Sequence, residues 1–128
     1  MNLAANRALA SFAFVASVGA LAGPARAAAP EMKDGVLTGD NGMTLYTYDK
    51  DKANSGKSAC AGACAKNWPP FLANASETAS GDYSFVERAD GKMQWAYKGK
   101  PLYFWHSDKK PGDKTGDGFK HVWRVAKG

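Results

Sequence analysis

Cysteine and histidine are scarce in this 128-residue sequence, which has two of each. No Cys-x-x-Cys-His or His-x-x-x-His pattern is present to attach haem or to position a metal ion. A Ser-centred nucleophile elbow and the His-Glu-x-x-His motif of metalloproteases are also absent. We therefore expect a protein that is not an enzyme and that carries no cofactor.

Long apolar runs are limited to one, residues 8–22, near the start of the chain. Arg7 precedes this run and Ala25-Arg26-Ala27 follows it, an order typical of an export signal peptide and its cleavage site. The run is shorter than the roughly 20 apolar residues of a membrane-spanning helix, so we predict a signal peptide over residues 1–27 and no transmembrane segment after it. No Cys follows the cleavage site to carry a lipid, which favours a periplasmic or secreted protein.

The remaining chain, residues 28–128, has no cluster of one charge. It holds 15 of the 17 basic residues against 12 acidic ones, and its lysines are scattered among Asp and Gly. Nucleic acid binding needs a basic patch or stripe, so we expect no nucleic acid partner. A segment of this length suffices for one small core, and we expect a single monomeric domain.

A ten-residue segment occurs twice. Residues 42–51 and 99–108 share a Gly, a Leu-Tyr pair, a second aromatic two residues after the Tyr, and an Asp three residues later. The offset between the copies is 57 residues, and two copies alone indicate one duplicated domain instead of an open solenoid. The repeat motif consists of Tyr46, Tyr48 and Asp51 in the first copy, and of Tyr103, Trp105 and Asp108 in the second.

Short runs rich in aromatic and apolar residues, separated by Gly-bearing turns, indicate antiparallel strands through most of the chain. We expect strands over residues 35–38, 43–48, 83–88, 92–97, 101–105 and 119–125. The Ala-rich segment 59–67 predicts a short helical turn near the two cysteines, which Pro69 and Pro70 must end. The fold class is therefore all-β or mainly β, with pseudo-repeats over about residues 36–71 and 86–125.

The two cysteines, Cys60 and Cys64, lie close together in the sequence. Outside the cytoplasm a lone close pair is usually oxidised, so we predict a disulfide between them. The bond closes a very small loop and contributes about 2 kcal/mol at most. A thiol-redox pair is the alternative, although its usual Cys-x-x-Cys spacing is one residue shorter.

Several of these motifs together resemble the secreted repeat family, exported bacterial proteins described as lipoproteins with a Tyr-x-(Phe/Trp/Tyr)-x-x-Asp motif. Both copies match that motif in full. The similarity extends to Cys60-x-x-x-Cys64-Ala65 with Trp68-Pro69-Pro70, to Gly99-x-Pro101-Leu102-Tyr103, and to Pro111-Gly112 ahead of Trp123. The resemblance implies export and a duplicated fold over about residues 36–125, and it implies no catalytic residues. The absence of a lipid-carrying Cys departs from the many members that look lipid-anchored.

The aromatic and Asp residues of the repeat motif suit two roles. Aromatic faces with a nearby carboxylate can bind a sugar, whereas half-buried aromatics with a turn-holding Asp build a small β core. We favour the structural role for the motif. The protein as a whole is interpreted as a non-enzymatic envelope module that binds an envelope component or a small ligand, or that has a structural role.

The alternative class is a periplasmic redox protein, or one that handles metal or haem, using the Cys60/Cys64 pair and His106. His106 and His121 are weak metal candidates, and methionines or the cysteines are the soft ligands that would have to join them. Each His is flanked by aromatic residues, which favours surface or packing roles.

Overall fold

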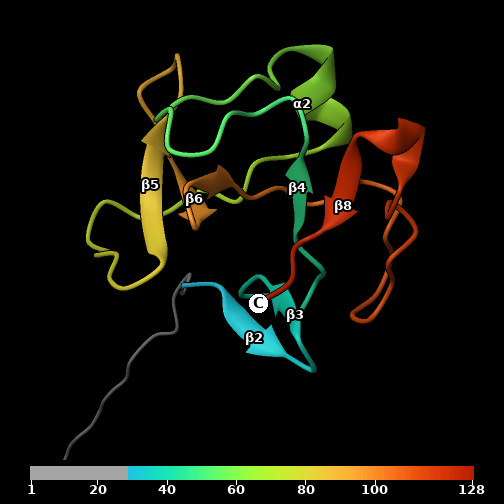
Figure 1. The fold of residues 1–128 in the computed structure, drawn as a ribbon. Helices are drawn as coiled ribbons and strands as arrows, with labels where there is room; N and C mark the ends of the chain where they lie inside the picture. The colour runs from blue at the N-terminus through green and yellow to red at the C-terminus, as the bar shows by residue number, and fades with distance from the viewer. Residues whose placement is uncertain (1–28) are drawn as a thin grey trace, which may run out of the picture.

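The computed structural model describes residues 29–128, and the predicted signal peptide over residues 1–27 lies outside them. Short strands are the main regular elements of the described chain, and turns and loops connect them (Figure 1). The strands are β2 (Glu31–Lys33), β3 (Val36–Thr38), β4 (Tyr46–Tyr48), β5 (Tyr83–Glu87), β6 (Met93–Tyr97), β7 (Lys100–Pro101) and β8 (Trp123–Val125). The helical elements are α2 (Ala63–Asn67) and the 3-10 turn η3 (Phe119–His121). The predicted mainly β class is confirmed.

All three small sheets are antiparallel. β2 pairs with β3, β5 with β6 and β6 with β7, each along consecutive stretches of chain. The remaining sheet joins distant parts of the chain, because β4 of the first repeat pairs with β8 at the end of the second repeat. In that pair Tyr46 lies opposite Val125 and Tyr48 opposite Trp123. The two repeats are therefore joined through backbone pairing as well as through side chains.

Three of the expected strands were wrong in extent. The segment predicted as a strand over residues 43–48 forms β4 only from Tyr46 onward. The segment predicted as a strand over residues 101–105 contributes only Pro101 to β7, and Tyr103 then makes isolated bridges to Tyr46 and Pro70. The segment predicted over residues 119–125 begins as the turn η3 and becomes a strand at Trp123. Gly118 takes the left-handed conformation before η3, with φ of 79°, and this turns the chain where the residue pattern suggested extension.

The two repeats meet at the motif tyrosines in a reciprocal way. Tyr46 N–H donates to the Tyr103 carbonyl at 2.8 Å, and Tyr103 N–H donates to the Tyr46 carbonyl at 3.0 Å. The residues just before the tyrosines also correspond, since Leu45 and Leu102 each donate to a buried strand carbonyl at 2.9 Å. Contacts of the form i to j and j to i are those of two equivalent units about a twofold axis. The halves are thus related by approximate twofold symmetry.

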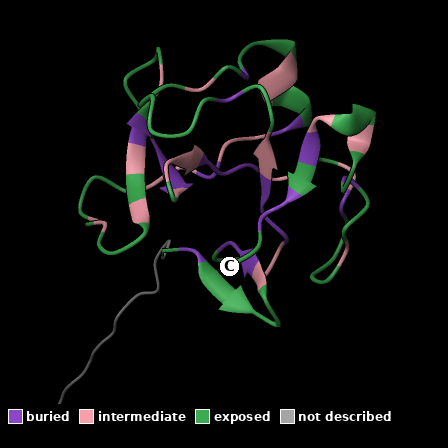
Figure 2. Cartoon of the chain, in the orientation of Figure 1, coloured by how far each residue is buried: buried purple, intermediate pink, exposed green. Residues whose placement is uncertain are grey.

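Buried residues follow the middle of the molecule (Figure 2) and form two clusters. One cluster is largely aliphatic with a few large rings, and it comprises Leu37, Leu45, Phe71, Trp95, Leu102 and Ala126. The other is dominated by aromatic rings, and it comprises Tyr46, Cys60, Trp68, Tyr103, Trp105, Trp123 and Val125. Both clusters take residues from both repeats, so neither repeat has a core of its own.

Three tryptophans of this cluster and Tyr48, which packs against it, stack in the order Tyr48–Trp123–Trp68–Trp105. We call this series of rings the aromatic column. Ring centroids are 4.2 Å apart for Tyr48 and Trp123, 3.7 Å for Trp123 and Trp68, and 4.0 Å for Trp68 and Trp105. The planes of Trp68 and Trp123 differ by 2°. Each repeat supplies two rings, and the column buries the large aromatic surface that drives packing in a small β domain.

Candidate functional site

The structure brings the repeat-motif residues together, and it does so across the two copies. Tyr46 O–H donates to Asp108 Oδ2 at 2.7 Å, and Tyr103 O–H donates to Asp51 Oδ2 at 2.7 Å. Each tyrosine therefore reaches the aspartate of the other repeat. This crossed pairing favours a structural role for the motif.

Each motif aspartate also holds the loop that follows it. Asp51 accepts from the Ala59 N–H at 2.6 Å, and Asp108 accepts from the N–H and the hydroxyl of Thr115 at 3.0 and 2.6 Å. Both aspartates are buried, at 4% and 7% exposure. A buried carboxylate is tolerated only when its oxygens are hydrogen-bonded, so loop and tyrosine together make these positions possible.

Burial changes how these groups titrate. It raises the pKa of Tyr46 and of Tyr103 above the ordinary tyrosine value, and the carboxylate that accepts each phenolic hydrogen raises it further. Burial also raises the pKa of Asp51, against the opposing effect of the hydrogen bonds from Ala59 and Tyr103. Both phenols therefore remain protonated in the folded protein at neutral pH.

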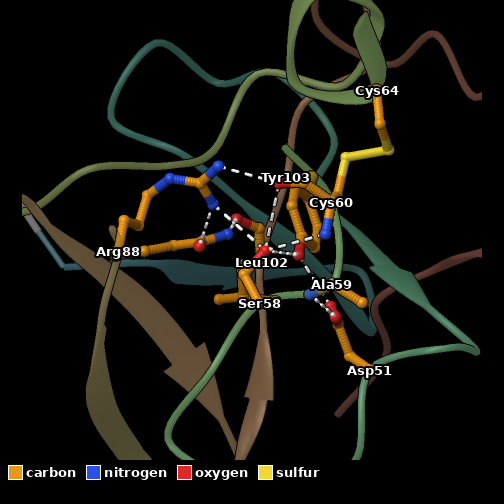
Figure 3. Close-up of a disulfide and its surroundings, with 9 residues drawn as sticks. Asp51, Ser58, Ala59, Cys60, Cys64, Arg88, Leu102 and Tyr103 are labelled. Carbon is orange, nitrogen blue, oxygen red and sulfur yellow. Dashed lines mark hydrogen bonds between the residues drawn. A yellow bond between two sulfur atoms is a disulfide. The ribbon is translucent and has the colours of Figure 1, made fainter. Parts of the chain in front are cut away.

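The cysteine sulfurs lie 2.09 Å apart, which supports the predicted Cys60–Cys64 disulfide (Figure 3). Cys60 is fully buried in the aromatic cluster, whereas Cys64 is half-buried in α2. Thiol exchange requires access of an attacking thiolate to a sulfur of the disulfide. The buried position of Cys60 closes one of the two sulfurs to attack, which favours a structural bond over a readily exchanged one.

Arg88 is the residue that sequence reasoning missed. Its Nη2 donates to the Cys60 carbonyl at 2.8 Å, and its Nη1 donates to Gln94 Oε1 at 2.8 Å and to Ser58 Oγ at 3.1 Å (Figure 3). Ser58 Oγ in turn lies 2.6 Å from the Tyr103 hydroxyl. One guanidinium therefore connects Gln94 of β6 with the loop that carries the Cys60–Cys64 disulfide. Through Ser58 it also reaches the hydroxyl of Tyr103. A signal existed in the sequence, because Arg88 and Arg124 are the only arginines after residue 27.

A depression of about 700 Å³ lies beside Arg88 and the disulfide loop, and we call it the Arg88 depression. Its wall combines two basic side chains, two acidic side chains and small apolar residues. It is lined by Gly56, Lys57, Ser58, Ala61, Gly62, Ala65, Glu87, Arg88, Ala89 and Asp90. This size is within the range of small-molecule sites.

The metal candidates are only partly brought together. Met43 and His106 line one depression of about 260 Å³, and the exposed His106 ring meets Trp105 edge-on at 4.7 Å. His121 and Met93 do not line it, and both are exposed. Within residues 29–128 there is no group of three or more His, Cys, Asp or Glu that could hold a metal ion.

The raised tyrosine pKa values predict alkaline destabilisation. A group whose pKa is higher in the folded state contributes stability that is present below the unfolded-state pKa of about 10 and is lost as pH rises above it. The free energy of unfolding should therefore fall above about pH 10, by about 1.4 kcal/mol per pH unit for each buried tyrosine. Urea melts over pH 8–11 measure this, and Tyr46→Phe should make the slope shallower by the contribution of one tyrosine, while Tyr83, whose pKa is also raised by burial, still contributes. An unchanged slope would contradict the buried, hydrogen-bonded phenols.

The disulfide generates a second prediction. Intact mass with and without reductant should differ by two hydrogens, and reduction should lower the free energy of unfolding by about 2 kcal/mol at most. A Cys60→Ser, Cys64→Ser double variant should show the same loss in denaturant melts. Free thiols in protein taken from the cell envelope would contradict the pairing.

Family comparison agrees with the duplicated arrangement. A family model described as a secreted repeat of unknown function matches the chain twice, over residues 29–71 and 84–127. These ranges contain the two motif copies and together cover more than half of the chain. Comparisons with curated proteins and with solved structures find no match. Within the described residues, no helix is long and apolar enough to cross a membrane. The chain belongs to the family of secreted repeats of unknown function.

Proposed function

We propose that the protein is a non-enzymatic, monomeric binding module, periplasmic or secreted, that takes a small zwitterionic ligand in the Arg88 depression. Membership of a secreted repeat family supports export. The observation that carries the ligand site is the guanidinium of Arg88, half-buried and held in place on the wall of the depression.

The guanidinium has donors to spare. It carries five N–H groups, and the protein bonds to Ser58, Gln94 and Cys60 use three of them. The Nε–H and the second Nη2–H share one edge and have no acceptor among the side-chain hydrogen bonds of residues 29–128. Such an edge binds a carboxylate through two parallel hydrogen bonds. Because three bonds already position Arg88, little side-chain entropy is lost on binding.

The other charges define the ligand further. Lys57 adds a second positive charge to the wall, while Glu87 and Asp90 add negative ones. A simple anion meets repulsion from the two carboxylates, whereas a ligand with both a carboxylate and an ammonium group is matched at both ends. The small apolar wall residues accommodate a short aliphatic side chain. An amino acid or a short peptide has this chemistry.

The site is specific to one half of the molecule. In the first repeat, β2 and β3 are joined by Asp34 and Gly35 alone, so no residue corresponds to Arg88. The depression beside that hairpin, lined in part by Lys33 and Asp34, is smaller, at about 170 Å³. Residues that occur in both repeats build the duplicated scaffold, whereas Arg88 has no counterpart in the first repeat and can bind a ligand.

Calorimetric titration with alanyl-alanine tests the proposal. The dipeptide with free termini should bind, and its C-terminal amide should bind roughly tenfold more weakly because it cannot accept two hydrogen bonds from Arg88. Arg88→Gln and Lys57→Gln should each weaken binding, and Lys57→Gln leaves the Arg88 hydrogen bonds intact. Arg124→Gln is the matched control, since Arg124 pairs with Asp49 on the surface. No binding, or equal binding by Arg88→Gln and the wild type, would refute the site.

A second candidate function, metal handling, rests on Met43 and His106 lining one depression. A thioether and an imidazole suit copper(I). If the binding-module proposal is right, a competitive copper(I) titration should show no micromolar or tighter binding that depends on these residues. Tight binding that is lost in His106→Ala but kept in His121→Ala would favour metal handling instead.

A further inference from the structure

The aromatic column runs through the core from the half-buried Tyr48 to the buried Trp105, which lies against an exposed histidine. Tyr48 at one end is half-buried. Trp105 at the other end is 9% exposed and touches the exposed ring of His106. Between these ends every neighbouring pair of rings is in stacking contact, with centroids no more than 4.2 Å apart.

Each central tryptophan of the column also meets one buried motif tyrosine. Tyr46 lies edge-on to Trp68 with centroids 5.2 Å apart, and Tyr103 lies edge-on to Trp123 at 5.1 Å. Both phenols donate to a buried carboxylate at 2.7 Å. The two aromatic side-chain types that lose an electron most easily are therefore in contact, and each phenol has a base within hydrogen-bond reach.

We propose that the aromatic column is a one-electron relay that carries oxidising equivalents from the protein surface to Tyr46 and Tyr103. The source is a strong one-electron oxidant outside the protein, such as a peroxide-oxidised haem or a peroxyl radical. This activity is separate from ligand binding, because it uses no residue of the Arg88 depression.

In one half of the molecule, the relay moves one electron and one proton. The external oxidant gains one electron from an end ring of the column, which becomes a radical cation. Electron transfer between stacked rings then moves the radical cation to Trp68. Tyr46 then gives one electron to the Trp68 radical cation, and the phenolic proton moves to Asp108 Oδ2. The products are the oxidant reduced by one electron, a neutral tyrosyl radical and a neutral carboxylic acid.

The crossed hydrogen bonds supply what phenol oxidation requires. An oxidised phenol is strongly acidic, so its oxidation is easy only when a base can take the proton at once. A base acts directly when it lies about 2.6–3.2 Å from the proton donor, as Asp108 and Asp51 do. The raised pKa of Asp51 supports this role in the Tyr103 half, because a more basic carboxylate accepts the proton more readily.

Two further tyrosines provide a matched control. Tyr83 and Tyr97 lie on the β5–β6 hairpin and tilt against each other at 5.2 Å. Among the side-chain hydrogen bonds of residues 29–128, neither phenol has a carboxylate partner. They also make no ring contact with the aromatic column, so the relay should not end on them.

Photo-oxidation of the full folded protein by a ruthenium tris-bipyridine complex with a sacrificial acceptor tests the relay. Freeze-quench electron paramagnetic resonance should show a tyrosyl radical. With Tyr48→Phe present in every variant, so that the tyrosine of the column itself gives no signal, the Tyr46→Phe, Tyr103→Phe pair should lower the tyrosyl yield about tenfold, because base-assisted proton transfer is lost, while the Tyr83→Phe, Tyr97→Phe pair should keep it. Tyrosyl formation should be slower in deuterated water.

Substitutions that keep the ring packing distinguish a relay from a merely structural core. Asp51→Asn with Asp108→Asn retains a hydrogen-bond acceptor but removes the base, and should shift the signal from tyrosyl to tryptophanyl radical. If either double variant fails to fold by near-ultraviolet circular dichroism, the single variants Tyr46→Phe and Asp108→Asn should each lower the tyrosyl yield by about half, since one of two end points remains. A tyrosyl radical that persists at the wild-type yield in all these variants, or that disappears in the Tyr83→Phe, Tyr97→Phe control, would overturn the relay.

Discussion

The crossed hydrogen bonds between Tyr46 and Asp108 and between Tyr103 and Asp51 are the interactions on which the rest of the structure depends. A buried phenol and a buried carboxylate are both costly without partners. Each motif tyrosine bonds to the aspartate of the other repeat. A single repeat would therefore leave both its tyrosine and its aspartate without these partners. The duplication is therefore a condition of burial, because each half completes the polar pairing of the other.

The candidate site is a consequence of the same pairing. Asp51 holds Ala59, and the adjacent Ser58 and Cys60 meet the guanidinium of Arg88. The loop that forms one wall of the Arg88 depression is thus anchored in the core, while the β5–β6 connection forms the other wall. Asp108 holds Thr115 in the equivalent loop of the second repeat. Equivalent anchors carry different loops, and the depression beside the first loop is larger than the one beside the second.

Local patterns predicted the parts of the fold that depend on local chemistry. Alternating aromatics and Gly-bearing turns indicated antiparallel strands, and β5 and β6 lie within two of the expected segments. The local residue pattern gave the wrong strand extents where the backbone conformation depends on pairing with distant residues. Tyr103 bonds to Tyr46 as an isolated bridge instead of extending β7, and Gly118 directs the chain into η3 before β8 begins. Both outcomes depend on residues far away in the sequence or on a turn that propensity does not reveal.

The sequence by itself determined the duplication, the mainly β class, the membership of a secreted repeat family and the closeness of Cys60 to Cys64, because each is written in composition or spacing. Only the tertiary structure decided that the motif residues pair across the repeats, that four aromatic rings stack in one column, and that Arg88 stands beside a depression. Those arrangements depend on how the two halves pack about their approximate twofold axis. The way in which two distant segments pack together cannot be read from the order of residues within either segment.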